Sequence, residues 1–127
     1  ATHVVNVKAT PTFVATDGVV WIFDTNDGTR GWDGLGVANG TAATSMTGYN
    51  KVPVADTFEY LQIALIDGDA IFSRFNADGK GGEVGRMIAA VTKTVLLTPW
   101  ISVEARNATS KTLTVDYVLA YQARTSI

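Results

Sequence analysis

Few residues of this chain combine the type and the spacing that chemistry requires. The chain has no cysteine and a single histidine, His3, which excludes thiol catalysis and cysteine-ligated zinc and leaves no basis for a histidine triad. Asp67, Asp69 and Asp78 fall near expected turns, and paired carboxylates could act as acid and base on a glycoside. Nothing in the sequence places two of them across a cleft, so solvated turn residues are the simpler interpretation. We expect a protein that is not an enzyme.

Two polar, glycine-containing segments approach ligand-binding patterns without meeting them. Residues 24–28 (Asp-Thr-Asn-Asp-Gly) are rich in oxygen donors, but their spacing fails the EF-hand pattern. Residues 79–82 (Gly-Lys-Gly-Gly) lack the Gly-x-x-x-x-Gly-Lys-Ser/Thr pattern of a phosphate loop. We interpret the first as a polar turn and the second as a hairpin loop, and we expect no metal and no cofactor. A calcium site of another type between loops stays open as an alternative.

Aromatic residues are the most informative candidates for binding. Trp21 and Phe23 share one face of an apolar segment and are expected in the core. Trp32 stands in a glycine-rich stretch, residues 30–36, that is interpreted as a loop. An indole there could stack on a sugar ring, anchor a protein interface or fold back onto the core. Tyr49 is a weaker case of the same kind.

The elements that would position these residues are β-strands. The chain has 17 Thr and 15 Val, which favour strands, and 12 Gly, which favour turns. Its 46% hydrophobic and 17% charged residues suit a globular domain, and a net charge of −2 argues against a nucleic-acid partner. No apolar run reaches the ~18 residues of a membrane span, and no signal peptide is visible.

Alternation of apolar and polar residues indicates where the strands lie. Residues 112–123 alternate most clearly and predict a long strand with one buried face. Residues 58–66 are apolar on both faces and predict a central strand. Asp67-Gly68 then predicts a hairpin to a strand at residues 70–75. Further strands are expected at residues 2–8, 12–15, 19–23, 93–98 and 100–106.

Two regions leave alternatives open. Residues 24–49 are either a long functional loop or short strands, at 35–38 and 42–46, joined by turns. Residues 83–92 are expected to be a strand, with a short helix as the alternative. About eight evenly spaced strands predict an all-β fold, a two-sheet antiparallel β-sandwich of the jelly-roll type. The expected domain is residues 1–127, with residues 1–11 as an extended N-terminal arm or edge strand.

The chain resembles two kinds of protein. Residues 23–32 (FDTNDGTRGW) resemble the opening of jelly-roll carbohydrate-binding modules, in which an acidic-Gly turn precedes a Gly-Trp pair. Residues 114–118 (TVDYV) resemble the closing strand of such modules. The whole chain resembles the decoration or cement proteins of tailed-phage capsids. The shared features are the absence of cysteine, richness in Thr, Val, Gly and Ala, an all-β pattern and an extended N-terminal segment.

The capsid resemblance implies a non-enzymatic structural protein of the virion, made in the host cytoplasm and placed on the outer capsid surface. Such a protein would bind the major capsid protein, clamp neighbouring coat subunits and form a dimer or trimer. The alternative is a carbohydrate-binding module in which Trp32 and Tyr49 stack on a glycan. The candidate interface or ligand contacts are Val4, Val5, Val7, Trp32, Leu35 and Tyr49.

Overall fold

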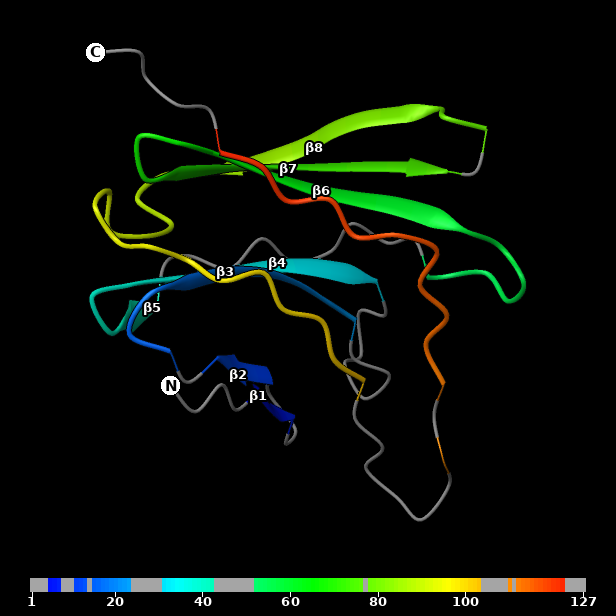
Figure 1. Ribbon diagram of the computed structural model, residues 1–127, viewed down its shortest axis with the longest axis horizontal. Coiled ribbons are helices and arrows are strands. Elements are labelled where there is room, and N and C mark those ends of the chain that lie inside the picture. The colour runs from blue at the N-terminus through cyan, green and yellow to red at the C-terminus, as the bar shows by residue number, and fades with distance from the viewer. Residues whose placement is uncertain are drawn as a thin grey trace. The chain divides into compact units, whose positions relative to one another are not determined.

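The computed structural model describes residues 5–7, 11–13, 15–23, 31–42, 52–76, 78–103, 110 and 112–122. The chain divides into two compact units, Ala1–Leu97 and Thr98–Ile127. The described strands all lie in the first unit (Figure 1). No helix among the described residues is long and apolar enough to cross a membrane.

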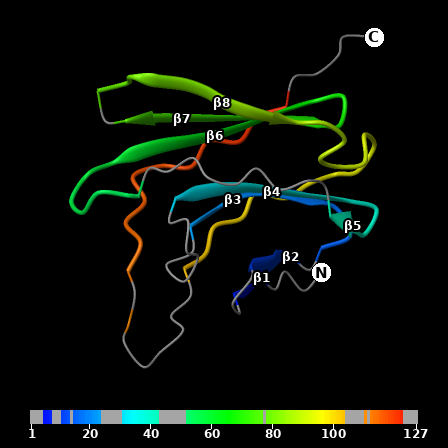
Figure 2. The same cartoon turned by 180° about the vertical axis from the view of Figure 1, so that it is seen from behind.

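The described part of the first unit contains two three-stranded antiparallel sheets and one short strand pair. β1 (Val5–Val7) pairs with β2 (Pro11–Phe13). β3 (Gly18–Phe23), β4 (Trp32–Ala38) and β5 (Thr41–Ala42) form the first sheet in that order. β6 (Glu59–Ile66), β7 (Asp69–Asn76) and β8 (Gly81–Met87) form the second sheet, which Figure 2 shows from behind. The expected all-β class with two antiparallel sheets is confirmed.

Tight turns fix the register of the hairpins. Asp67 and Gly68 join β6 to β7 with φ values of 53° and 86°, and Asn39 and Gly40 join β4 to β5 with 48° and 74°. A two-residue turn with positive φ at both positions matches the twist of the strands, and Asn, Asp and Gly tolerate it best. The hairpin predicted at Asp67-Gly68 is confirmed. It sets Ile66 opposite Asp69 and, at the far end, Glu59 opposite Asn76.

The core lies where the two sheets contact each other. Phe72 of β7 is fully buried, and it packs with Met87 and Ala90. The Trp21 ring of β3 meets the Phe72 ring edge-on, with 5.0 Å between centroids and 85° between planes. The expectation that Trp21 belongs to the core is confirmed. Ile63 of β6 packs against the same cluster.

β4 corrects the interpretation of residues 30–36 as a loop. A Cβ added to Gly34 would lie 2.9 Å from the Phe72 ring, and one added to Gly36 would lie 2.6 Å from Met87 Sδ. Glycine at these positions therefore leaves room for the larger side chains of the facing sheet. The apolar side chains that pack at the inward positions of β4 belong to the opposite sheet. The glycine-rich sequence of β4, taken alone, therefore resembles a loop.

The second correction concerns the strands that were expected nearest the C-terminus. Residues 93–103, 110 and 112–122 are described without any strand, so the predictions at 93–98 and 112–123 are wrong for these residues. The prediction at 100–106 is wrong for 100–103, and 104–106 lie outside the described residues. Alternation identifies an apolar face, but a strand also needs a partner for its backbone groups. β8 ends at Met87, so the strand expected over 83–92 is confirmed only in its first half.

β6 corrects a third expectation. In the described sheet it is an edge strand and β7 is the central one, although both faces of β6 are apolar. Tyr60, Leu65 and Ile66 of β6 remain 42%, 43% and 53% exposed. The apolar residues on both faces of this strand are thus not covered as a central strand would require.

Candidate functional site

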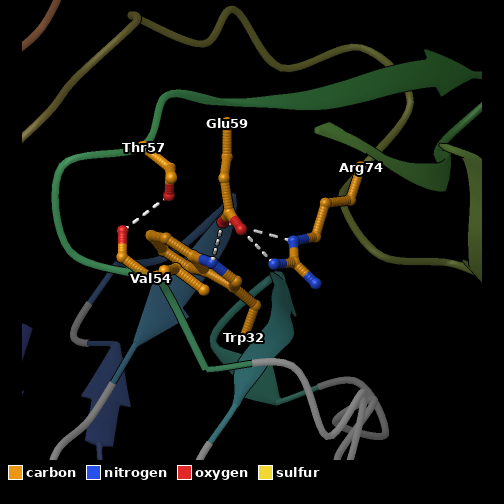
Figure 3. A network of polar contacts seen from close by, with 5 residues as sticks. All are labelled: Trp32, Val54, Thr57, Glu59 and Arg74. Carbon is orange, nitrogen blue, oxygen red and sulfur yellow. Dashed lines mark hydrogen bonds and ion pairs between the residues drawn. The ribbon is translucent and has the colours of Figure 1, made fainter. Parts of the chain in front are cut away.

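The Trp32 corner is one of two polar contacts among the described residues that link β3 or β4 to β6, the other being the hydrogen bond from Trp21 Nε1 to the Gln62 carbonyl at 3.1 Å. We use this name for Phe23, Trp32, Glu59 and Arg74. The Trp32 indole Nε1 donates to Glu59 Oε2 at 2.9 Å, and Arg74 Nε donates to the same oxygen at 3.3 Å. Arg74 Nη2 donates to the other oxygen, Glu59 Oε1. Figure 3 shows the Trp32 and Arg74 side chains converging on the Glu59 carboxylate.

Strand register explains how these side chains meet. Arg74 stands opposite Leu61 in the β6–β7 ladder, which makes it the diagonal neighbour of Glu59. Diagonal positions are within reach of long side chains. Trp32 lies an even number of residues from Gly34, so it shares the face of β4 that meets the β6–β8 sheet. The two-residue hairpin and the pleat of β4 together bring donor and acceptor into one corner.

The ion pair in this corner is largely shielded from water. The Arg74 and Glu59 side chains are 12% and 13% exposed. Desolvation of both charges is costly, so such a pair is stable only when its geometry is good and its other hydrogen-bonding groups are satisfied. The Trp32 N–H supplies the additional bond to Oε2. The arrangement suits a structural clamp, because both carboxylate oxygens already accept bonds within the protein.

Trp32 is therefore committed to the fold. It is half-buried, and its ring lies against Phe23 with 5.7 Å between centroids and a 51° tilt. A ring that stacks on a sugar needs an open face, and an indole whose N–H is bonded to Glu59 has a fixed orientation. Of the three roles open for Trp32, the geometry favours folding back onto the protein.

The other candidate contacts do not gather around Trp32. Leu35 is half-buried and lies an odd number of residues from Trp32, so it belongs to the opposite face of β4. Val5 and Val7 lie in β1, opposite Phe13 and Pro11 of β2. Val4 and Tyr49 lie outside the described residues, as do the segments 24–28 and 104–109.

A second clamp is centred on Asp17, just before β3. Asp17 Oδ1 accepts the backbone N–H of Thr92 at 2.8 Å and that of Asn39 at 3.2 Å. The hydrogen bond from the Thr92 side chain, followed by the bond from its backbone, holds the pKa of Asp17 below its usual value. One carboxylate thus ties the start of β3 to the β4–β5 turn and to the chain after β8.

The carboxylates near the β6–β7 turn are paired with cations. Asp69 accepts the Ala89 N–H at 2.9 Å and Arg86 Nη2 at 2.8 Å, and these bonds, the Ala89 one first, lower its pKa. Lys93 Nζ lies 2.6 Å from Asp67 Oδ2, and this hydrogen bond raises the pKa of Lys93. The described parts of the chain hold no group of three or more side chains that could bind a metal ion. Fixed ion pairs in exposed turns fit a structural role better than acid–base chemistry.

The larger feature is a run of exposed apolar side chains at the end of the first unit (residues 95–97) and among the described residues of the second unit (98–103 and 112–121). Leu96, Leu119 and Tyr121 are 89%, 73% and 80% exposed. Large hydrophobic side chains this open are typical of surfaces that bind another protein. Other members of the run are Val95, Leu97, Trp100, Ile101, Val103, Leu113, Val115, Tyr117 and Val118.

Sequence reasoning missed the roles of Glu59, Arg74 and Asp17. For the first two a signal was present, because the Asp67-Gly68 turn fixes the register and makes them diagonal neighbours. For Asp17 no local signal exists, since its partner Thr92 lies 75 residues away. In comparisons with known proteins, no family model, no curated protein and no solved structure matches this chain.

Proposed function

We propose that this protein is a non-enzymatic structural protein of a virion, which decorates a capsid and cements neighbouring coat subunits. In this proposal it sits on the outer capsid surface, binds the major capsid protein and acts as a homo-oligomer. The observation that carries the proposal is the exposed apolar side chains of the second unit, at the described residues 98–103 and 112–121. Surfaces of this kind are costly in water unless a protein partner covers them.

The uses of the ionisable groups also support a structural role. Glu59 and Asp17 are clamps within the first unit, and Asp67 and Asp69 are paired with cations. Binding that depends on buried apolar area needs no charged side chains at the centre of the interface, because the interior of a stable interface is depleted of charge. A contact of ~800 Å² per partner is sufficient for stable binding, and repetition over a shell strengthens it through avidity.

The finer fold that we propose is a jelly-roll β-sandwich. Contacts between the two sheets at Trp21–Phe72 and Trp32–Glu59 support face-to-face packing. The apolar alternation of residues 112–122 supports an additional strand in the assembled protein. A jelly roll contains eight strands in two sheets, so the described sheets of three strands each would gain strands on assembly.

The test of the capsid role is the size of the particle that carries the chain. A gentle lysate of the source is sedimented, and the fractions are analysed by mass spectrometry. We expect the chain in a megadalton particle, at a fixed high copy ratio to one other protein. Recovery only as a small free species would overturn the capsid role, and a glycan screen with native protein and Trp32→Ala would then test the carbohydrate-binding alternative.

A further inference from the structure

Asn39 and Gly40 form the tip of the β4–β5 hairpin, and their order in the chain makes Asn39 chemically labile. The chain has six asparagines, and Asn39 is the one that a glycine follows. Both residues are exposed. Because glycine has no side chain, its backbone nitrogen is the least hindered nucleophile that can follow an asparagine. The tip of this hairpin therefore has the residue types that spontaneous deamidation requires.

Deamidation at this position needs water as its only co-reactant. The Gly40 nitrogen gives its proton to hydroxide or water and attacks Asn39 Cγ. A bond from this nitrogen to Cγ forms as the bond from Cγ to the side-chain nitrogen breaks, and the amide group leaves with a proton as ammonia. Water then opens the resulting succinimide at either carbonyl, which leaves aspartate or isoaspartate at position 39. The sum of the steps exchanges one amide NH2 for OH, with no oxidation or reduction.

The folded turn holds the reacting atoms apart. Asn39 has a φ of 48° and Gly40 one of 74°, and in this left-handed region ψ is about +30 to +60°. At such a ψ the Gly40 nitrogen is anti to the Asn39 Cβ about the Cα–C bond, so it does not reach Cγ. The Gly40 N–H also donates to the Thr16 carbonyl at 2.7 Å. Closure of the succinimide therefore requires rotation about the Asn39 ψ and loss of the bond to Thr16, which means that the turn must open.

We propose that Asn39 is a site of spontaneous deamidation and that Asp17 sets its rate, because the Asp17 carboxylate holds the β4–β5 turn closed. Asp17 Oδ1 accepts the Asn39 N–H at 3.2 Å and the Thr92 N–H at 2.8 Å, so it ties the turn to the chain after β8. β5 has two residues, both exposed, so the turn opens without unfolding the core. Where opening and closing are faster than the chemistry, the rate of modification follows the fraction of open molecules. This inference does not depend on the capsid role.

The modification weakens the clamp that controls it. Either product places a new carboxylate at position 39, whose backbone N–H is bonded to the Asp17 carboxylate, and like charges this close repel each other. Isoaspartate also adds one carbon to the backbone inside the turn, whereas the ladder sets Ala38 directly opposite Thr41. A two-residue turn does not accommodate the added carbon. The modified chain therefore loses the β4–β5 pairing, and no step of the reaction restores the asparagine.

The purified native chain provides the first test, in mildly alkaline buffer at a fixed temperature. Samples taken over weeks are digested and analysed by mass spectrometry, which locates each exchange of NH2 for OH, and fragmentation separates isoaspartate from aspartate. In the chain unfolded by guanidinium, we expect Asn39 to convert before any other asparagine. In the folded chain, Asn39 should convert at least about tenfold more slowly than in the unfolded chain.

Asp17→Ala provides the second test, because it removes the carboxylate without creating another asparagine before Gly18. It should speed the conversion of Asn39 in the folded chain by about tenfold, since hydrogen bonds to a charged group contribute this much to an opening equilibrium. Asp78→Ala is the matched control, because Asp78 is an exposed aspartate in the β7–β8 turn, and it should leave the rate unchanged. Circular dichroism under the incubation conditions checks that both variants stay folded.

The two tests are independent, so the comparison of folded with unfolded native chain decides the matter if Asp17→Ala does not fold. Equal rates for Asn39 in the folded and the unfolded native chain would overturn the proposal. So would earlier conversion of another asparagine in the unfolded chain, or a folded Asp17→Ala chain in which Asn39 converts no faster than in the native chain.

Discussion

Trp32 of β4 donates its indole N–H to the Glu59 carboxylate of β6, and this 2.9 Å bond joins the two sheets at one corner. The same carboxylate holds Arg74 of the neighbouring strand. A charge-assisted bond between sheets restricts how they slide, because sliding would separate a shielded ion pair from its donor. The corner therefore helps to fix the relative position of the two sheets, which also meet through the Trp21–Gln62 hydrogen bond and through apolar contacts around Phe72.

The first prediction concerns the charge at this corner. Glu59→Gln keeps the shape of the side chain and removes its charge, which leaves the Arg74 guanidinium shielded from water without a counterion. We expect a loss of about 3 kcal/mol in the free energy of unfolding. Trp32→Phe removes the N–H donor together with part of the ring that packs on Phe23, while the Glu59–Arg74 pair stays intact, and should cost about 1–2 kcal/mol. Urea unfolding followed by circular dichroism measures both.

Glu83→Gln is the matched control, because Glu83 is an exposed glutamate in β8 of the same sheet. It should change the unfolding free energy by less than about 0.5 kcal/mol. Equal losses for Glu59→Gln and Glu83→Gln would show that the corner is not a clamp.

The second prediction concerns the close approach of β4 to the opposite sheet. Gly34→Ala places a Cβ 2.9 Å from the Phe72 ring, so one of the two must shift. We expect a loss of about 1–3 kcal/mol in the free energy of unfolding. In a Phe72→Leu background the ring is gone, and the same alanine should cost less. Additive losses in the double variant would contradict a direct clash.

The fold of residues 18–87 was largely predictable, and the exceptions have physical causes. The Asp67-Gly68 hairpin was found because its turn requires positive φ at both positions. A strand at 35–38 was one of two alternatives and is confirmed, but the start of β4 was assigned to a loop because Gly34 and Gly36 gain their apolar neighbours from Phe72 of β7 and Met87 of β8. A local pattern cannot show a contact made by residues far along the chain.

The candidate site was harder to predict than the fold. Trp32 was singled out as a candidate contact, but no pattern in the sequence indicates that Glu59 is its partner. The register of the β6–β7 hairpin is enough to predict that Glu59 and Arg74 are neighbours. The contact between Trp32 and Glu59 depends instead on how the two sheets pack. Residues 112–122 show the opposite error, since their alternation predicts a strand and the structure describes none there.

The third prediction is an acid sensitivity that depends on Asp17. Its hydrogen bonds lower its pKa below the ordinary value of 3.8. A carboxyl with a lower pKa in the folded than in the unfolded chain stabilises the fold above the unfolded value, and that contribution is lost as the pH falls through the folded value. Asp17→Asn should therefore be less stable than the native protein at neutral pH, with the difference shrinking below about pH 3.8. Urea midpoints measured across this range give the comparison.

Asp56→Asn is the control for Asp17→Asn. Asp56 is exposed and has a φ of 58°, a conformation that asparagine tolerates as aspartate does. Its substitution should leave the urea midpoint almost unchanged at every pH. If the two variants behave alike, the bonds from Thr92 and Asn39 do not stabilise the fold through the charge of Asp17.

The last prediction separates binding from folding in the N-terminal segment. Deletion of residues 1–8 removes β1, one half of a short β1–β2 pair of three residues per strand. An isolated two-stranded pair is only marginally stable, so the unfolding temperature should change little. If the segment binds a coat subunit, its deletion should raise the dissociation constant for the particle about tenfold or more, a loss of about 1.4 kcal/mol of binding free energy per contact.

A variant with residues 1–8 in scrambled order is the control for this deletion. It keeps the length and composition of the segment and should bind the particle as weakly as the deletion does. Unchanged particle binding after deletion would show that the coat-binding surface lies elsewhere, and the exposed apolar residues at 100–103 and 113–121 would then be the ones to vary next.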